Sequence, residues 1–244
     1  GTTSGLAHSR DVSFDAAFAT FPTSETIHVS DTKSLTMTAS YHEGYGTARQ
    51  ASDFNTPANL TSFDFDPYGR LAAITRPYDT SALPTTSYTY RLGVGTNGAV
   101  NAVETRSREA HAQPGTVDAF AYSDGLGREL ATVEEGEVGF IVAKALRYNR
   151  RGAARDVLQP YVAGAAGSGF ELLPSDRTVS TYDAVGRPVD VAQPPDGNGV
   201  IGHVTTEYLP LARKVFDELS NEMRYFDDGL GRLAEVNEIN RRDI

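Results

Sequence analysis

One short pattern constrains the fold of this chain more than any other feature: an aspartate followed three residues later by glycine and arginine. It occurs four times, as Asp66, Gly69 and Arg70; Asp124, Gly127 and Arg128; Asp183, Gly186 and Arg187; and Asp228, Gly231 and Arg232. An aromatic residue stands one or two positions before each aspartate, as Tyr182 does before Asp183. Weaker copies occur at 148–152 and 216–220, and a copy that is one residue short ends at Gly93. The chain is therefore an array of one repeated unit.

The physical content of the pattern is a tight turn between two strands. Aspartate at the first position and glycine at the fourth are the preferences of a type I turn, in which the carboxylate accepts hydrogen bonds from turn N–H groups. The glycine then takes a positive φ and begins a bulge that joins two antiparallel strands. Residues that alternate between polar and β-branched or aromatic types flank the turns, as in "V-S-T-Y" and "R-P-V-D-V". This pattern predicts an all-β chain of tandem antiparallel hairpins.

Two segments have helical propensity, and they test the all-β interpretation. Residues 99–112 are the better helix candidate and residues 210–219 are the next. The first segment lies between two hairpin units, so we expect a strand there.

Composition excludes several classes of function. The net charge of −10 and the isoelectric point near 4.9 argue against a nucleic-acid partner, which requires a basic surface. The one basic cluster, at 147–155, is interpreted as a solvated turn. No run of apolar residues is long enough to span a membrane. The absence of cysteine excludes disulfides, thiolate catalysis and cysteine zinc sites.

The repeated pattern resembles the YD or RHS repeat family. Residues 63–80 and 181–199 match the family consensus Y-D-x-x-G-R-L with the strand that follows it. Residues 41–66 resemble the long-form repeat of the B component of bacterial Tc insecticidal toxins and of SpvB-linked proteins. The resemblance divides the chain into an N-terminal tail or boundary at 1–13, degenerate long-form repeats at 14–62, YD/RHS repeats at 63–238, and a C-terminal end at 239–244.

The resemblance also implies an architecture and a role. Such repeats form a curved or spiral sheet that is part of a hollow β-shell, which encloses a toxic segment. The chain is then expected to be a non-catalytic piece of a longer, secreted or cell-surface-associated bacterial protein, which encapsulates or helps deliver a toxin. Its partners are the remaining RHS repeats of the parent chain or a partner toxin subunit. The family's self-cleaving motif of the D-P-x-G-L type has no counterpart here.

No motif indicates catalysis, a cofactor or a metal. The stretch Gly93–Gly98 spells a dinucleotide fingerprint but lies among hairpins, so it is interpreted as a glycine-rich turn, and "G-S-G" at 167–169 as a flexible loop. The five histidines are scattered, and "P-P-D-G-N-G" at 194–199 is interpreted as a plain turn. We therefore expect no enzyme activity, no cofactor and no metal site.

The recurring tyrosines and arginines allow one alternative function. Aromatic faces beside hydrogen-bond donors bind sugars in many repeat proteins, so a carbohydrate-binding or adhesive module with glycan partners is the alternative. In the structural interpretation, Tyr182 packs across strands, while Arg187 pairs with the aspartate of a neighbouring turn or stacks on an aromatic ring. The structural role is favoured because the Tyr–Arg pair recurs in register with the turn.

Overall fold

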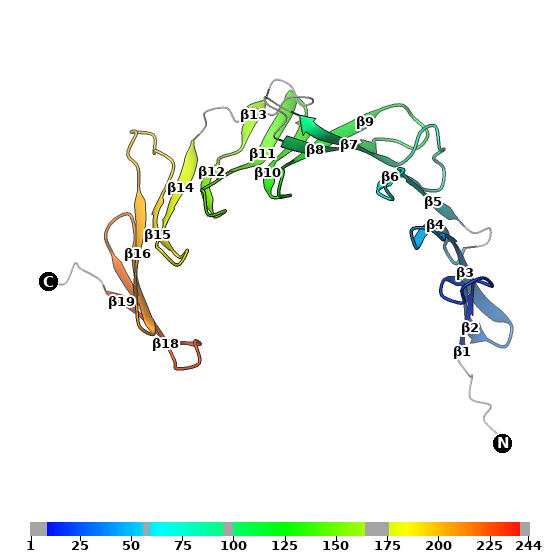
Figure 1. The fold of residues 1–244 in the computed structure, drawn as a ribbon, viewed down its shortest axis with the longest axis horizontal. Helices are drawn as coiled ribbons and strands as arrows, with labels where there is room; N and C mark the ends of the chain where they lie inside the picture. Colours follow the sequence, from blue (N-terminus) through cyan, green and yellow to red (C-terminus); the bar gives the residue numbers. More distant parts are fainter. Residues whose placement is uncertain (1–8, 56–58, 95–99, 164–175, 240–244) are drawn as a thin grey trace, which may run out of the picture. The chain divides into compact units, whose positions relative to one another are not determined.

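The computed structural model describes residues 9–55, 59–94, 100–163 and 176–239, and these contain nineteen strands and no helix (Figure 1). The strands are β1 Ser9–Phe14, β2 Pro22–Ser30, β3 Lys33–His42, β4 Thr47–Ser52, β5 Leu60–Phe65, β6 Leu71–Thr75, β7 Thr86–Val94, β8 Val100–Arg108, β9 Thr116–Asp124, β10 Glu129–Gly136, β11 Gly139–Tyr148, β12 Ala154–Leu158, β13 Tyr161–Ala163, β14 Arg177–Tyr182, β15 Pro188–Ala192, β16 His203–Leu209, β17 Ala212–Phe216, β18 Glu222–Asp227 and β19 Leu233–Ile239. The prediction of an all-β fold is confirmed.

Both helix candidates contain strands. The better candidate, 99–112, contains β8, as predicted, and the second, 210–219, contains β17. Tertiary pairing decides the conformation of both segments, because each lies beside strands that offer backbone hydrogen-bond partners.

Most strands pair antiparallel with the next strand in the chain. This holds from β1 to β7 and from β14 to β19. Between these runs, β11 pairs with β10, with β12 and with the short β13, while β12 also pairs with β14. The predicted tandem hairpins are confirmed.

The chain divides into two compact units. Unit 1 comprises residues 1–91 and 103–119, and unit 2 comprises 92–102 and 120–244. The buried apolar core lies in unit 2 and consists of Ala102, Phe120, Tyr122, Ala131, Val133, Val142, Ala145 and Leu158. Strands β9 and β10 supply it through alternate positions, as the period of two in a strand requires.

The boundaries expected at 13/14, 62/63 and 238/239 stay predictions. The first strand begins at Ser9 and the last ends at Ile239. Most of the glycine-rich stretch after Gly93, the loop at 167–169 and residues 240–244 lie outside the described residues.

Candidate functional site

The repeated turns have one hydrogen-bond pattern, which the turn at Asp183 illustrates. The N–H of Asp183 donates to the carbonyl of Arg187 at 2.9 Å, and the N–H of Gly186 donates to the carbonyl of Asp183 at 3.2 Å. The Oδ1 atom of Asp183 accepts the N–H groups of Val185 and Arg187 at 3.0 and 2.9 Å. The carboxylate therefore satisfies the turn donors that no strand partner reaches.

Positive φ at the fourth position is shared by all of these turns. The values are 76° at Gly69, 76° at Gly127, 83° at Gly152, 90° at Gly186, 80° at Gly199, 65° at Ser220 and 76° at Gly231. The strand register shifts by one residue just before several turns, as between Thr181 and Tyr182. This is a bulge that begins on a left-handed residue. Asp196 and Asp217 cap two of these turns in the same way.

Two longer loops use the same capping principle and were missed in the sequence. Asp53 accepts the N–H groups of Asn55 and Asn59 at 2.9 and 3.0 Å, and Asp15 accepts that of Phe21 at 2.7 Å. In both loops the last donor lies six residues after the aspartate, so a search for glycine three residues on does not detect them. Gly93, which the sequence suggested as the end of a shortened copy of the turn, lies instead inside β7. Its N–H donates to Oδ1 of Asn101 at 3.3 Å.

Each motif arginine pairs with the aspartate of its own turn. The Nε–Oδ2 distance is 2.7 Å for Arg70–Asp66, Arg128–Asp124 and Arg187–Asp183, and 2.8 Å for Arg232–Asp228. The expected pairing with a neighbouring turn's aspartate is therefore wrong. The bulge brings the first and fifth side chains of the turn together, so the nearest carboxylate is the arginine's own.

The arginines also stack on tyrosines of the following strands. The guanidinium carbon lies 4.1 Å from the Tyr90 ring centroid for Arg70, 4.6 Å from Tyr148 for Arg128 and 4.2 Å from Tyr208 for Arg187. Within these pairs, Tyr90 donates its hydroxyl to the carbonyl of Leu71 at 2.9 Å, and Tyr148 to that of Glu129 at 2.7 Å. Tyr90 and Tyr148 thus each join their own hairpin to the preceding one by a cation–π contact and a hydrogen bond, and Tyr208 does so by a cation–π contact.

Tyr182 makes the same kind of link between hairpins. Its hydroxyl donates to the carbonyl of Ala154 at 2.5 Å, which connects β14 to β12. One turn away, the guanidinium of Arg151 donates to the carbonyls of Ala184 and Asp183, each at 2.8 Å. The basic cluster at 147–155 thus includes an arginine that connects two successive turns.

The turn carboxylates are held in the ionised form. The backbone N–H of Arg187 and its side chain lower the pKa of Asp183, and those of Arg232 do the same for the pKa of Asp228. At Asp124 desolvation opposes ionisation, but the hydrogen bonds from Arg128 outweigh it and the pKa is lowered. Ionised carboxylates whose oxygens already accept hydrogen bonds within the turn stabilise that turn and are not suited to acid–base catalysis.

Two of the buried acids outside the repeated turns, Glu104 and Asp156, lie in strands and are surrounded by arginines. Glu104 in β8 is 2% exposed and is paired with Arg91 and Arg106. Its burial opposes ionisation, but hydrogen bonds from both arginines prevail and lower the pKa of Glu104. In unit 2, Asp156 lies 3.8 to 4.0 Å from three arginines, namely Arg147, Arg155 and Arg177.

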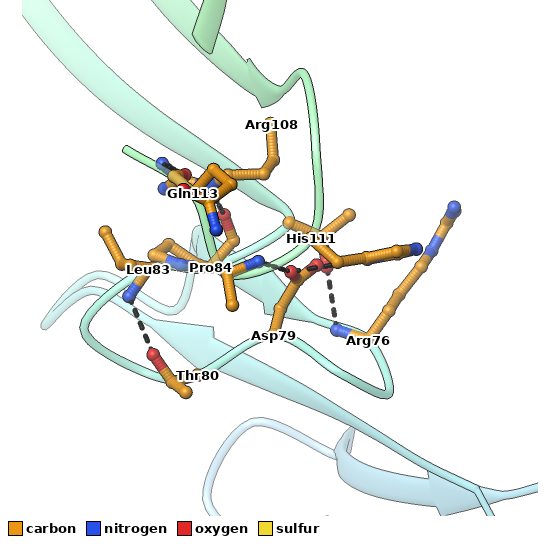
Figure 2. A network of polar contacts seen from close by, with 10 residues as sticks. Arg76, Asp79, Thr80, Leu83, Pro84, Arg108, His111 and Gln113 are labelled. Carbon is orange, nitrogen blue, oxygen red and sulfur yellow. Dashed lines mark hydrogen bonds and ion pairs between the residues drawn. The ribbon is translucent and has the colours of Figure 1, made fainter. Parts of the chain in front are cut away.

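A separate polar network joins two loops of unit 1 around Asp79 (Figure 2). The Asp79 side chain is fully buried and accepts the hydroxyl of Thr85 at 2.5 Å and the N–H of Ala112 at 2.9 Å. His111 lies with Nδ1 3.3 Å from Asp79 Oδ1. Sequence reasoning missed this network, because His111 is 32 residues from Asp79 and the only local signal is the turn sequence Pro77-Tyr78-Asp79.

Neither a cluster of metal ligands nor a membrane-spanning helix occurs in the described part of the chain. No three His, Asp or Glu side chains within them are grouped as a metal site would require. No helix there has the length and hydropathy needed to cross a bilayer.

Comparison with known proteins shows a fold similarity. The chain matches the crystal structure of TcdB2-TccC3-TEV with a TM-score of 0.72 and 13% identity, over 96% of this chain and 16% of that one. It also matches the crystal structure of TcdB2-TccC3 that lacks the hypervariable C-terminal region. The TM-score is 0.66 and the identity 13%, and the match covers 96% of this chain and 18% of that one. This chain therefore spans less than a fifth of the length of either match.

No protein-family model matches the chain. A search of curated proteins finds no significant match.

The structural matches confirm the resemblance on which the repeats were identified. Over 96% of its length this chain has a fold similar to that of part of the TcdB2-TccC3 chains.

Proposed function

We propose that this chain is a non-catalytic wall segment of an RHS-type shell, which encloses or helps deliver a bacterial toxin. The observation that carries the proposal is the fold match to TcdB2-TccC3 over 96% of the chain. The share of 16% of that chain supports a segment that works together with further repeats of a parent chain or with a partner toxin subunit. A secreted or cell-surface-associated bacterial protein is the setting in which such a segment would act.

The contacts between hairpins support a structural role for the motif residues. Each motif aspartate accepts turn N–H groups, and three of the arginines lie over tyrosines of following strands. Repeat arrays gain stability from contacts between neighbouring units, and the arginine–tyrosine contacts are of this kind. Asp66, Gly69, Arg70 and their equivalents are therefore proposed to hold the wall together.

The carbohydrate-binding alternative has less support. A sugar-binding aromatic ring needs an open face and free donors nearby. The rings of Tyr90, Tyr148 and Tyr208 instead lie against arginines. The hydroxyls of Tyr90, Tyr148 and Tyr182 donate to backbone carbonyls. The tyrosines that suggested sugar binding are thus used within the fold.

The test is a cryo-electron microscopy structure of the complete protein that contains this sequence, combined with limited proteolysis. We expect these hairpins in the wall of a hollow particle and an enclosed segment that trypsin does not cleave. The double variant Tyr148→Ala/Tyr182→Ala should loosen the wall and expose that segment to trypsin. The control variant Tyr68→Ala should leave the segment protected. A particle without an enclosed cavity would refute the wall function, whereas an equally protected segment in all variants would refute the role of Tyr148 and Tyr182 in holding the wall together.

A further inference from the structure

A cleft in unit 1 has the features of a ligand site that the wall function does not require. Its volume is about 600 Å³, within the usual range for small-molecule sites. The cross-strand pair Phe63 and Ile74 contributes apolar surface, and Arg76, Tyr78 and His111 line it as well. All of these residues belong to unit 1.

The backbone beside the cleft is strained in a way that glycine would relieve. Pro77 and Tyr78 are the central residues of a turn closed by the Asp79 N–H, which donates to the carbonyl of Arg76 at 3.2 Å. Tyr78 has a φ of 76°, at the position where a type II turn favours glycine. A bulky residue at positive φ is unfavourable, and such strain is concentrated at functional sites.

The strain has no evident benefit for the fold, because the Tyr78 side chain is 78% exposed. What the turn achieves is to place the ring beside His111, with 5.9 Å between ring centroids and a tilt of 58°. The loop that carries His111 is also held at a positive φ, of 54°, at Ala112. Two strained loops thus present two rings at one edge of the cleft.

The buried carboxylate of Asp79 fixes this arrangement. It accepts the N–H of Ala112 from one loop and the hydroxyl of Thr85 from the other. Because an ionised carboxylate only accepts, His111 donates from Nδ1 and keeps Nε2 for another partner. Figure 2 shows the side chains of Arg76 and His111 extending to the same side of the network.

Two charged side chains line the cleft, Asp53 and Arg76, and only that of Arg76 is without a partner in the described part of the chain. The carboxylate of Asp53, which also lines the cleft, accepts backbone and side-chain hydrogen bonds from Asn55 and Asn59. The guanidinium of Arg76 makes no ion pair with any other described residue. The cleft therefore offers one unpaired guanidinium and one imidazole to an anionic group of a ligand, while the oxygens of Asp53 are already hydrogen-bonded.

We propose that this cleft binds a ligand in which a carboxylate is attached to an apolar ring. The ring would lie against Phe63 and Ile74 with Tyr78 at its edge. The carboxylate would pair with Arg76 and, when the imidazole carries a proton on both nitrogens, accept the Nε2–H of His111. A free small molecule and the C-terminal residue of a peptide both have this chemistry.

The test is calorimetric titration of the full chain with N-acetyl-phenylalanine, its C-terminal amide, and the tripeptide Ala-Ala-Phe. Saturable binding of N-acetyl-phenylalanine or Ala-Ala-Phe is expected, and the amide should bind at least about tenfold more weakly, as loss of one charged hydrogen bond implies. Tighter binding of Ala-Ala-Phe than of N-acetyl-phenylalanine would identify a chain terminus as the ligand, and the reverse a free small molecule. No saturable binding of either carboxylate, or equal binding of the amide, would overturn the proposal.

Two pairs of variants separate binding from folding. Arg76→Gln should weaken binding about tenfold, while Arg49→Gln, on an exposed arginine of β4 that does not line the cleft, should not change it. Tyr78→Gly should abolish binding while leaving the melting temperature unchanged or higher, because it removes the strain. The control is Leu211→Gly, which relieves the strain of a non-glycine residue at a φ of 55° away from the cleft and should leave binding intact. Unchanged binding in Arg76→Gln and Tyr78→Gly would refute the assignment.

Discussion

At the scale of the residue, the two glycines of the turn Asp124–Arg128 have different requirements. Gly127 has a φ of 76°, whereas Gly125 is not among the residues with positive φ, and an added Cβ meets no atom within 4 Å at either position. Gly127→Ala should therefore cost about 1 kcal/mol of stability from backbone strain alone. Gly125→Ala should change stability by less than about 0.5 kcal/mol. Urea unfolding of both variants measures this difference, and equal costs would contradict it.

The buried carboxylate of Glu104 should matter more than an exposed one. Glu104→Gln leaves Arg91 and Arg106 without their anion. Because these arginines are 38% and 51% exposed, water replaces part of the interaction, and we expect a cost of about 2 kcal/mol. The matched control is Glu207→Gln, whose exposed pair with Lys214 should be worth less than about 1 kcal/mol. Comparable losses in the two variants, measured by denaturant unfolding, would show that burial of Glu104 does not matter.

At the scale of the element, the tyrosine hydroxyls are predicted to stabilise contacts between hairpins. Tyr148→Phe keeps the ring under Arg128 but removes the hydrogen bond to Glu129, so it should cost about 1 kcal/mol. Tyr68→Phe is the control, because Tyr68 is 83% exposed and its hydroxyl has no hydrogen-bond partner among the described residues. Thermal unfolding of both variants tests the assignment. A Tyr148→Phe protein as stable as the parent would contradict it.

The elements also show which features could be predicted from sequence. The turn at Asp183 and Gly186 was predictable because its chemistry is local and its spacing fixed. The loop capped by Asp53 was not, because the same cap spans a loop of different length. The stacking of Arg187 on an aromatic ring was anticipated, but its ion-pair partner was not, because residue types do not specify how a bulge orients side chains. The contact between Asp79 and His111 depends on tertiary structure and left no periodic signal.

At the scale of the whole molecule, stability should depend on pH through the capping carboxylates. The pKa is lowered at Asp15, Asp53, Asp66, Asp79, Asp124, Asp183, Asp196, Asp217 and Asp228, and also at Glu104. These groups bind fewer protons in the folded chain than in the unfolded one, where an aspartate has a pKa of about 3.9. Their stabilisation is thus complete above that value and is lost as the pH falls.

The free energy of unfolding should therefore be nearly constant from pH 7 to about pH 5 and fall steadily below about pH 4. For Asp53, whose backbone and side-chain hydrogen bonds from Asn59 lower its pKa to about 2, the loss continues down to that value. Asp196→Asn gives a matched test, because Asn149 already caps a turn through the N–H groups of Arg151 and Ala153. The variant keeps the cap and removes one titrating group, so its stability should fall less steeply between pH 4 and pH 2. An identical slope would show that Asp196 does not contribute to the acid sensitivity.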